Sequence, residues 1–189
     1  MRATAGCVAA VHSATASGCP HQWPLPRGAI LVISGNLSLD AGGPGFDLFE
    51  PNSNYVRVFT PKETFGPAEW RRMIYQTKPR MQLDGVFGAF DCPDAGQIAP
   101  RRIQSTTPLQ ALNLLNSGFA LQQSAIFAER IQRDAGDDPA ALVRRAFRLV
   151  YQRLPDETEL RESIALIRDH GLSTLCRVIL NSNEFLYVF

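Results

Sequence analysis

The stretch "DPAALVRRAFRLVYQRLPDETELRESIALIRDHG", Asp138–Gly171, contains two complete helix patterns in succession. In the first, Asp138 is a natural N-cap and Pro139 suits the first helical position. In the second, Asp156 and Glu159 have capping-box spacing, and Gly171 is a natural helix stop. Apolar residues recur at helical spacing between these signals. In the first pattern they are Leu142, Ala146, Leu149 and Val150. We therefore expect two amphipathic helices joined by a short connection.

Similar periodicity continues on both sides of this stretch. "TPLQALNLLNS" starts at Thr107, "FALQQSAIFAERIQR" follows Gly118, and "STLCRVILNSNEFLYVF" starts at Ser173. Each has apolar residues three or four positions apart, which is typical of a helix with one buried face. The residues expected on these faces are Leu109, Leu112 and Leu115, with Leu114 beside them; Leu121, Ala125 and Ala128; and Leu175, Val178 and Ile179. Residues 107–189 thus predict five antiparallel helices with short connections.

Residues 28–106 have a different character, with more loops and fewer periodic runs. "AILVISGNL" from Ala29 reads as the end of a helix capped by Gly35 or Asn36. "GGPG" at 42–45 predicts a tight turn, under which the neighbouring apolar residues pack. These residues are Phe46, Leu48 and Phe49.

Three further elements are expected in this part of the chain. "NYVRVF" at 54–59 predicts a short strand, "FGPAEWRRMIYQTK" at 65–78 a helix, and Asp84-Gly85 either a short β-hairpin or a tight turn. The fold class is therefore mainly α, with an antiparallel helical C-terminal bundle preceded by a loop-rich segment with one helix and a candidate hairpin. We expect one domain over 28–189, divided into a loop-rich part (28–106) and a helical part (107–189).

The first 27 residues match neither pattern. They are rich in Ala, Ser, Thr, Gly and Pro, and His12 and Ser13 interrupt their only weakly apolar stretch. A secretion signal needs a stronger apolar segment, so we find no convincing signal peptide. We interpret residues 1–27 as a disordered arm or as the product of a mis-started or shifted reading frame.

Composition narrows the functional classes. Hydrophobic residues make up 45% of the 189, which suffices for a packed core, and the net charge of +1 disfavours a nucleic-acid binder. No apolar run approaches the roughly 20 residues of a membrane-spanning helix. The cysteines and histidines show no ligand spacing, so no metal site is predicted. They are Cys7, Cys19, Cys92, Cys176, His12, His21 and His170. Cys176 is expected in the core.

The stretch "FDCPDAGQIAPRRIQSTTPLQAL", Phe90–Leu112, holds the candidate site. A helix that starts at Thr107, with Gln110 completing a capping box, exposes N–H groups beside two guanidinium groups and so favours an anion. Alternatively the nearby aspartates pair with the arginines, or serve as an acid/base pair or hard-metal ligands. The anion-site residues are Asp91, Asp94, Arg101, Arg102, Thr106 and Thr107. No catalytic residue is assigned.

Several longer strings resemble a known family. "GGPGFDLFEPNSNYVRVF", "PRRIQSTTPLQALNLLNSGF" and "RVILNSNEFLYV" occur in the order found in the planctomycete-specific C-terminal domain of unknown function 1553. The resemblance starts near Ala29, where the family has a longer preceding helix, which favours a truncated fragment. It implies the C-terminal domain of a larger exported protein, periplasmic or at the cell surface. The N-terminal domains of that protein would be its partners.

The resemblance also implies what the chain carries itself. Family members often include a c-type haem domain, but this sequence has no CxxCH, so haem c would belong to an upstream domain and none to this chain. The expected function is an accessory or interaction domain, with a small-molecule ligand unknown. The alternative is part of an enzyme acting on extracellular polysaccharide or another anionic polymer, and a helical nucleic-acid binder is disfavoured by the charge balance.

Overall fold

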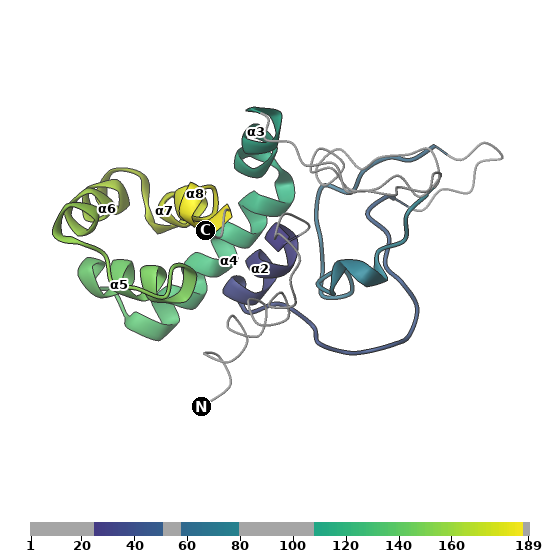
Figure 1. The fold of residues 1–189 in the computed structure, drawn as a ribbon, viewed down its shortest axis with the longest axis horizontal. Coiled ribbons are helices and arrows are strands. Elements are labelled where there is room, and N and C mark those ends of the chain that lie inside the picture. The colour runs from purple at the N-terminus through teal and green to yellow at the C-terminus, as the bar shows by residue number, and fades with distance from the viewer. Residues whose placement is uncertain (1–24, 51–57, 80–107, 187–189) are drawn as a thin grey trace, which may run out of the picture.

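A computed structural model describes residues 25–50, 58–79 and 108–186 of the chain (Figure 1). This part is mainly helical, as predicted, and contains isolated β-bridges but no β-strand. The strand expected at 54–59 falls largely outside the described residues, and the hairpin at 84–85 falls wholly outside them. The helices are α2 (Leu25–Ser34), the 3-10 helix η1 (Met73–Tyr75), α3 (Pro108–Asn116), α4 (Gly118–Ala135), α5 (Pro139–Val150), α6 (Glu157–His170), α7 (Leu172–Leu180) and α8 (Asn183–Leu186).

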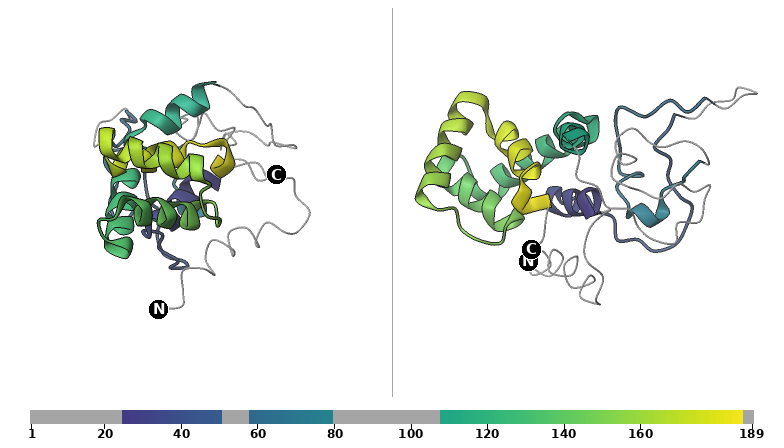
Figure 2. Two further views of the ribbon diagram at one scale, coloured as in Figure 1. Left: turned by 90° about the vertical axis from the view of Figure 1, so that its left-hand side faces the viewer. Right: turned by 45° about the horizontal axis from the view of Figure 1, so that its top comes forward.

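Helix α4 is the centre of the fold. It packs against α2, α5 and α7, while α6 closes the bundle by packing against α5 and α7. The helical part and the loop-rich part lie at opposite ends of the long axis, with α2 between them (Figures 1 and 2). The core residues that are least exposed are Leu31, Phe127, Ile131, Val143, Ala146 and Cys176. The expected core position of Cys176 is therefore confirmed.

The predicted helix ends are confirmed in α5 and α6. The Asp138 carboxylate accepts hydrogen bonds from the backbone N–H groups of Ala140 and Ala141. Asp156 and Glu159 form the reciprocal capping box. Gly171 has φ +86°, a left-handed conformation that glycine adopts without strain, and it ends α6.

Helix α2 begins at Leu25, so Arg27 is one of its residues. At the other end Gly35 has φ +85° and ends the helix, as its sequence predicted. Arg130 of α4 donates to the carbonyl oxygens of Val32 and Ile33 in the last turn of α2, where helix carbonyls lack i+4 donors. This contact fastens the end of α2 to α4.

The predicted buried face of α4 is correct at Ala128 and wrong at Leu121 and Ala125. Leu121 and Ala125 are exposed, and the helix buries a face one or two residues further on, which includes Gln123 and Ser124. Polar residues lie inside because Gln123 Oε1 accepts from Ser34 Oγ at 2.6 Å, and buried polar groups need such partners. In the neighbouring helices Leu112 and Val178 are about half exposed against expectation, whereas Leu175 and Ile179 are buried as predicted.

The helix predicted over 65–78 is also wrong, since only η1 forms there. Its backbone groups bond to other segments: Ser38 N–H donates to the Trp70 carbonyl, and Phe46 N–H to the Tyr75 carbonyl. An α-helix needs those carbonyls for its own i to i+4 bonds. Tertiary contacts therefore override a sequence that has good local helix signals.

The loop-rich part is built around residues 46–50. On one side this segment pairs with Tyr75 and Thr77, and on the other with Thr60 and Lys62. Its apolar side chains pack inward below the Gly42–Gly45 turn, as expected: Phe46, Leu48 and Phe49 are buried. The result is a three-segment layer held by isolated bridges rather than by a regular sheet.

Arg27 joins the loop-rich part to the helices. Its side chain is 0% exposed, and its guanidinium donates to the carbonyl oxygens of Arg71, at 2.6 Å, and Glu69. The guanidinium also lies over the rings of Phe46 and Phe119, 4.6 and 5.5 Å from their centroids. Such a cation, buried between aromatic rings and carbonyls, fixes the loop against α2 and α4.

Candidate functional site

The site predicted from the sequence lies outside the described residues. This holds for all six of its members: Asp91, Asp94, Arg101, Arg102, Thr106 and Thr107. The adjoining helix α3 does begin at Pro108, where the capping pattern placed the first helical residue. The anion site itself stays a prediction.

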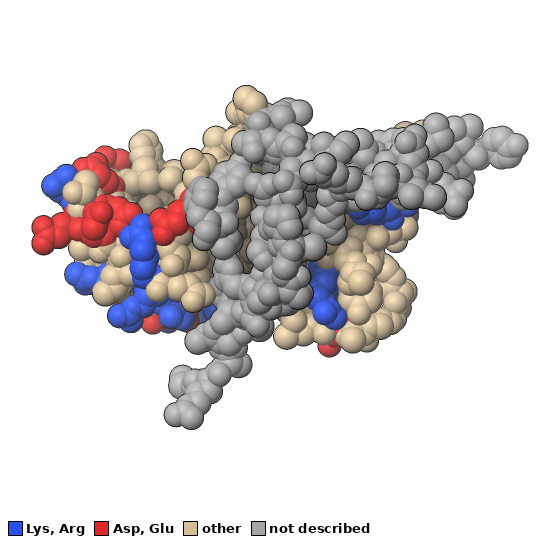
Figure 3. Space-filling model, in the orientation of Figure 1, with Lys and Arg blue, Asp and Glu red and all other residues tan. Residues whose placement is uncertain are grey.

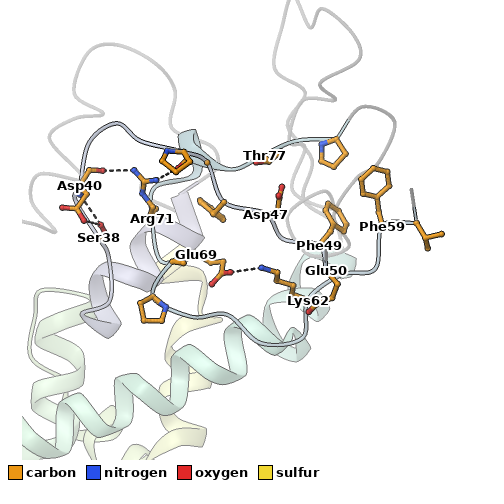
Figure 4. A pocket seen from close by; sticks show the side chains of 17 residues that line it. Ser38, Asp40, Asp47, Phe49, Glu50, Phe59, Lys62, Glu69, Arg71 and Thr77 are labelled. Atoms are coloured by element: carbon orange, nitrogen blue, oxygen red, sulfur yellow. Dashed lines mark hydrogen bonds and ion pairs between the residues drawn. The ribbon is translucent and has the colours of Figure 1, made fainter. Parts of the chain in front are cut away.

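A pocket of about 790 Å³ lies in the loop-rich part (Figure 4). Three segments supply its lining, at 38–50, 58–69 and 71–79. A volume of this size is in the range of small-molecule and oligomer sites. The polar lining residues fall into two groups. Some form hydrogen bonds that hold the loops together, and only the others are available to bind a ligand.

Arg71 is engaged in this way. Its guanidinium donates to the carbonyl oxygens of Pro44, at 2.6 Å, and of Gly42, and it lies 4.1 Å from the centre of the Tyr75 ring. The Tyr75 hydroxyl in turn accepts a hydrogen bond from Gly42 N–H at 2.9 Å. That bond is the main cause that holds the pKa of Tyr75 below its ordinary value, with Arg72 and Arg71 contributing. Arg71 and Tyr75 therefore clamp the glycine turn from below.

Glu69 is engaged as well. Its carboxylate accepts hydrogen bonds from Lys62 Nζ and from Gly66 N–H, each at 2.8 Å. Burial would raise the pKa of Glu69, but the bonds from Lys62 and Gly66 outweigh it, so the pKa lies below the ordinary value. At neutral pH Glu69 is an ionised and fully occupied group, which fits a structural role better than proton donation.

Asp47 and Glu50 differ from these residues, because their side chains make no hydrogen bond or ion pair in the described part of the chain. Both are exposed and alternate with the buried apolar residues of the same segment. In the view of Figure 4, Asp47 lies between Arg71 and two phenylalanine rings. Those rings, Phe49 and Phe59, meet edge to face with centroids 5.4 Å apart. The pocket thus offers free acceptors next to an apolar wall.

Sequence reasoning missed this pocket. The signal available for it was the run "FDLFE" at 46–50, in which the exposed acids Asp47 and Glu50 stand next to buried apolar residues. Its other lining residues extend from Ser38 to Pro79, and no spacing rule connects them. The prediction that Phe46, Leu48 and Phe49 pack inward was correct, but it did not extend to the neighbouring acids.

The described part of the chain contains neither a candidate metal site nor a reactive thiol. It contains no group of three or more His, Cys, Asp or Glu side chains that could hold a metal ion. Burial raises the pKa of the Cys176 thiol to about 12, so this cysteine is an inert core residue. None of the described helices combines the length and the apolar character needed to cross a membrane.

The helical part has a mixed surface. In Figure 3, Lys and Arg side chains stand beside Asp and Glu side chains on the helical end of the molecule. Some of them pair directly, as Arg145 does with Asp134 at 2.6 Å. The face that is seen therefore presents both signs together instead of one continuous basic field.

Taken together, these observations describe a mainly helical domain with a pocket in its loop-rich part. Residues 26–167 match the family PSD1, described as "Protein of unknown function (DUF1553)", and the chain belongs to this family. The resemblance found in the sequence is confirmed at that level. No curated protein and no solved structure matches the chain.

Proposed function

We propose that the chain is an accessory domain of a larger exported protein, and that it acts by binding a polysaccharide chain in the pocket of residues 38–79. The export and the company of further domains, including a c-type haem domain upstream, rest on the family resemblance. The binding role rests on the pocket.

One observation supports the binding role: some polar side chains of the pocket are hydrogen-bonded to the protein, whereas two acidic side chains are not. Glu69, Lys62 and Arg71 hold the loops in place, whereas Asp47 and Glu50 keep their carboxylate oxygens free. Free carboxylates accept hydrogen bonds from sugar hydroxyls, and an apolar wall covers the C–H face of a sugar ring. A rigid frame with these two features favours recognition of a hydroxyl-rich chain.

The enzymatic alternative is less well supported by this pocket. Hydrolysis of a glycosidic bond uses one carboxylic acid with a raised pKa and a second carboxylate as base or nucleophile. The most buried acid of the pocket, Glu69, has a lowered pKa and two donors on its carboxylate. We therefore favour binding without bond cleavage at this pocket.

Calorimetric titration against a panel of soluble polysaccharides tests the proposal, with a reducing-end assay run on the same mixtures. We expect one saccharide class to bind without release of reducing ends. Phe59→Ala should weaken that binding about tenfold, because it removes the half-buried ring of the apolar wall.

Ile74→Ala is the matched control, since Ile74 is 83% exposed and does not line the pocket. Absence of binding to every polysaccharide would overturn the proposal, and release of reducing ends would replace it with the enzymatic alternative. Export is tested separately by fractionating the source cells with an antibody against the chain: a purely cytoplasmic signal contradicts it.

A further inference from the structure

We infer that the pocket selects a saccharide chain that bears protonated amino groups over a neutral or acidic one. This inference deepens the proposed function and rests on it. It adds the charge of the ligand, which the free carboxylates of the pocket determine.

The lining of the pocket carries more negative than positive charge. Four carboxylates line the pocket against two cations, Lys62 and Arg71, and four minus two leaves two negative charges. Lys62 is neutralised within the wall by Glu69 at 2.8 Å. The other three lining acids are exposed: Asp40 accepts a hydrogen bond from Ser38 Oγ at 2.9 Å, whereas Asp47 and Glu50 make no side-chain hydrogen bond or ion pair in the described part of the chain.

The cationic side chains of the lining already donate hydrogen bonds within the protein. A saccharide with carboxylate or sulfate groups needs cationic or N–H donors in the wall. Arg71 already donates hydrogen bonds to the carbonyl oxygens of Gly42 and Pro44. The Nζ of Lys62 is held by Glu69. An acidic chain would meet two uncompensated carboxylates, which costs binding energy as like charges approach. An ammonium group supplies three donors and the opposite charge.

The pairing of the main chain in the pocket favours a saccharide over a basic peptide. Extended peptides usually bind by adding a strand to a free sheet edge. The central segment 46–50 is already paired on both sides: Phe46 with Tyr75 and Thr77, and Leu48 with Lys62. With those main-chain groups occupied, recognition depends on the side-chain acceptors and the wall of Phe49 and Phe59. This arrangement favours a ring with hydroxyl and amino groups.

The test compares oligomers of glucosamine and of N-acetylglucosamine with equal length, by calorimetric titration of the full chain in one mildly acidic buffer. We expect the amine-bearing oligomer to bind at least about tenfold more tightly, and added salt to reduce that ratio. The double variant Asp47→Asn with Glu50→Gln should abolish the preference.

Both substituted side chains are exposed, and each single variant is measured as well, so a folding defect in the double variant leaves the test intact. The control is Glu162→Gln on α6, which is 68% exposed and far from the lining in the chain. It should keep the wild-type preference.

The outcomes separate the two proposals. Equal binding of both oligomers, or a preference that persists in the double variant, overturns the inference and leaves polysaccharide binding standing. Failure of both oligomers together with every other polysaccharide overturns the proposed function as well. A lysine-rich peptide of the same charge that binds more tightly than the glucosamine oligomer overturns the choice of a saccharide.

Discussion

The helical part and the loop-rich part share one apolar core, to which the loop-rich part contributes Phe46, Leu48 and Phe65, but they differ in how much they depend on side-chain donors. Within the helical part Arg177 donates to the Leu115 carbonyl, and in the loop-rich part such contacts are more numerous. In the helical part, apolar faces of α4, α5 and α7 meet in one core, and the helix ends are capped by residues two or three positions away. In the loop-rich part, long polar side chains donate to main-chain carbonyls across separations of 27, 44 and 57 residues. These donors are Arg71, Arg27 and Gln122.

The difference bears on cooperativity. A core of apolar faces loses contacts everywhere when one large side chain is removed, because its members share neighbours. A layer fastened by a few side-chain donors opens where the donor is lost, and the remainder keeps its own contacts. The two parts should therefore respond differently to substitutions of similar severity.

The largest expected effect comes from Arg27→Met. The change leaves the carbonyls of Glu69 and Arg71 without their buried donor and should destabilise the loop-rich part by about 3 kcal/mol. Hydrogen exchange should accelerate at the Phe46 and Thr77 amides, which bond across the layer, while the amides of α5 stay protected. Exchange that rises equally in both parts would contradict the comparison.

Phe127→Ala is the matched change in the helical part, since Phe127 is likewise 0% exposed. It creates a cavity that costs about 3–5 kcal/mol, and it should lower the urea midpoint of the whole domain. A variant in which only α4 loses protection would show that the helical part is less cooperative than its shared core implies.

A smaller effect, of opposite sign at two sites, is expected for glycine to alanine changes. At Gly118 a Cβ would lie 2.8 Å from the carbonyl oxygen of Glu63, so Gly118→Ala should push the loop off α4 and cost about 2 kcal/mol. At Gly28, inside α2, no atom lies within 4 Å of a Cβ, and Gly28→Ala should stabilise by about 1 kcal/mol. Thermal unfolding of both variants measures the contrast, and a destabilised Gly28→Ala would refute it.

The smallest effect is the pH dependence that arises at Glu159 in the helical part. Hydrogen bonds from Arg153 lower the pKa of Glu159 from 4.5 to about 2. Because the folded pKa is depressed, the stabilisation is fully present above about pH 4.5 and is lost as the pH falls towards 2. Glu159→Gln, which keeps the shape, should reduce the drop in urea midpoint over this interval. Glu162→Gln on the same helix is the control. If it reduced the drop in urea midpoint equally, the contact between Arg153 and Glu159 would not be the cause of the pH dependence.

The helical part could be predicted because its signals are local. Asp138, Asp156 and Gly171 mark helix ends through contacts within a few residues, and those marks were correct. The rotation of α4 was not predictable in the same way. Its buried face is set by partners such as Ser34, which lies 89 residues from Gln123, and a polar pair of this kind has no periodic signature.

The loop-rich part could be predicted only where packing is simple. The burial of Phe46, Leu48 and Phe49 below the glycine turn follows from their own sequence, whereas the helix expected over 65–78 did not form. Its carbonyls are used by distant donors such as Arg27. The pocket escaped prediction for a related reason, since Asp47 and Glu50 are distinguished from other acids by the partners they lack.

The contact of Arg27 has a consequence for how this family can vary. Its guanidinium recognises two main-chain oxygens, and every amino acid at positions 69 and 71 would present the same oxygens. The contact therefore imposes no residue type on those two positions, and paired substitutions between them and position 27 would carry no trace of it. Comparisons of homologous sequences should reveal Arg27 as a single constrained position whose reason is visible only in three dimensions.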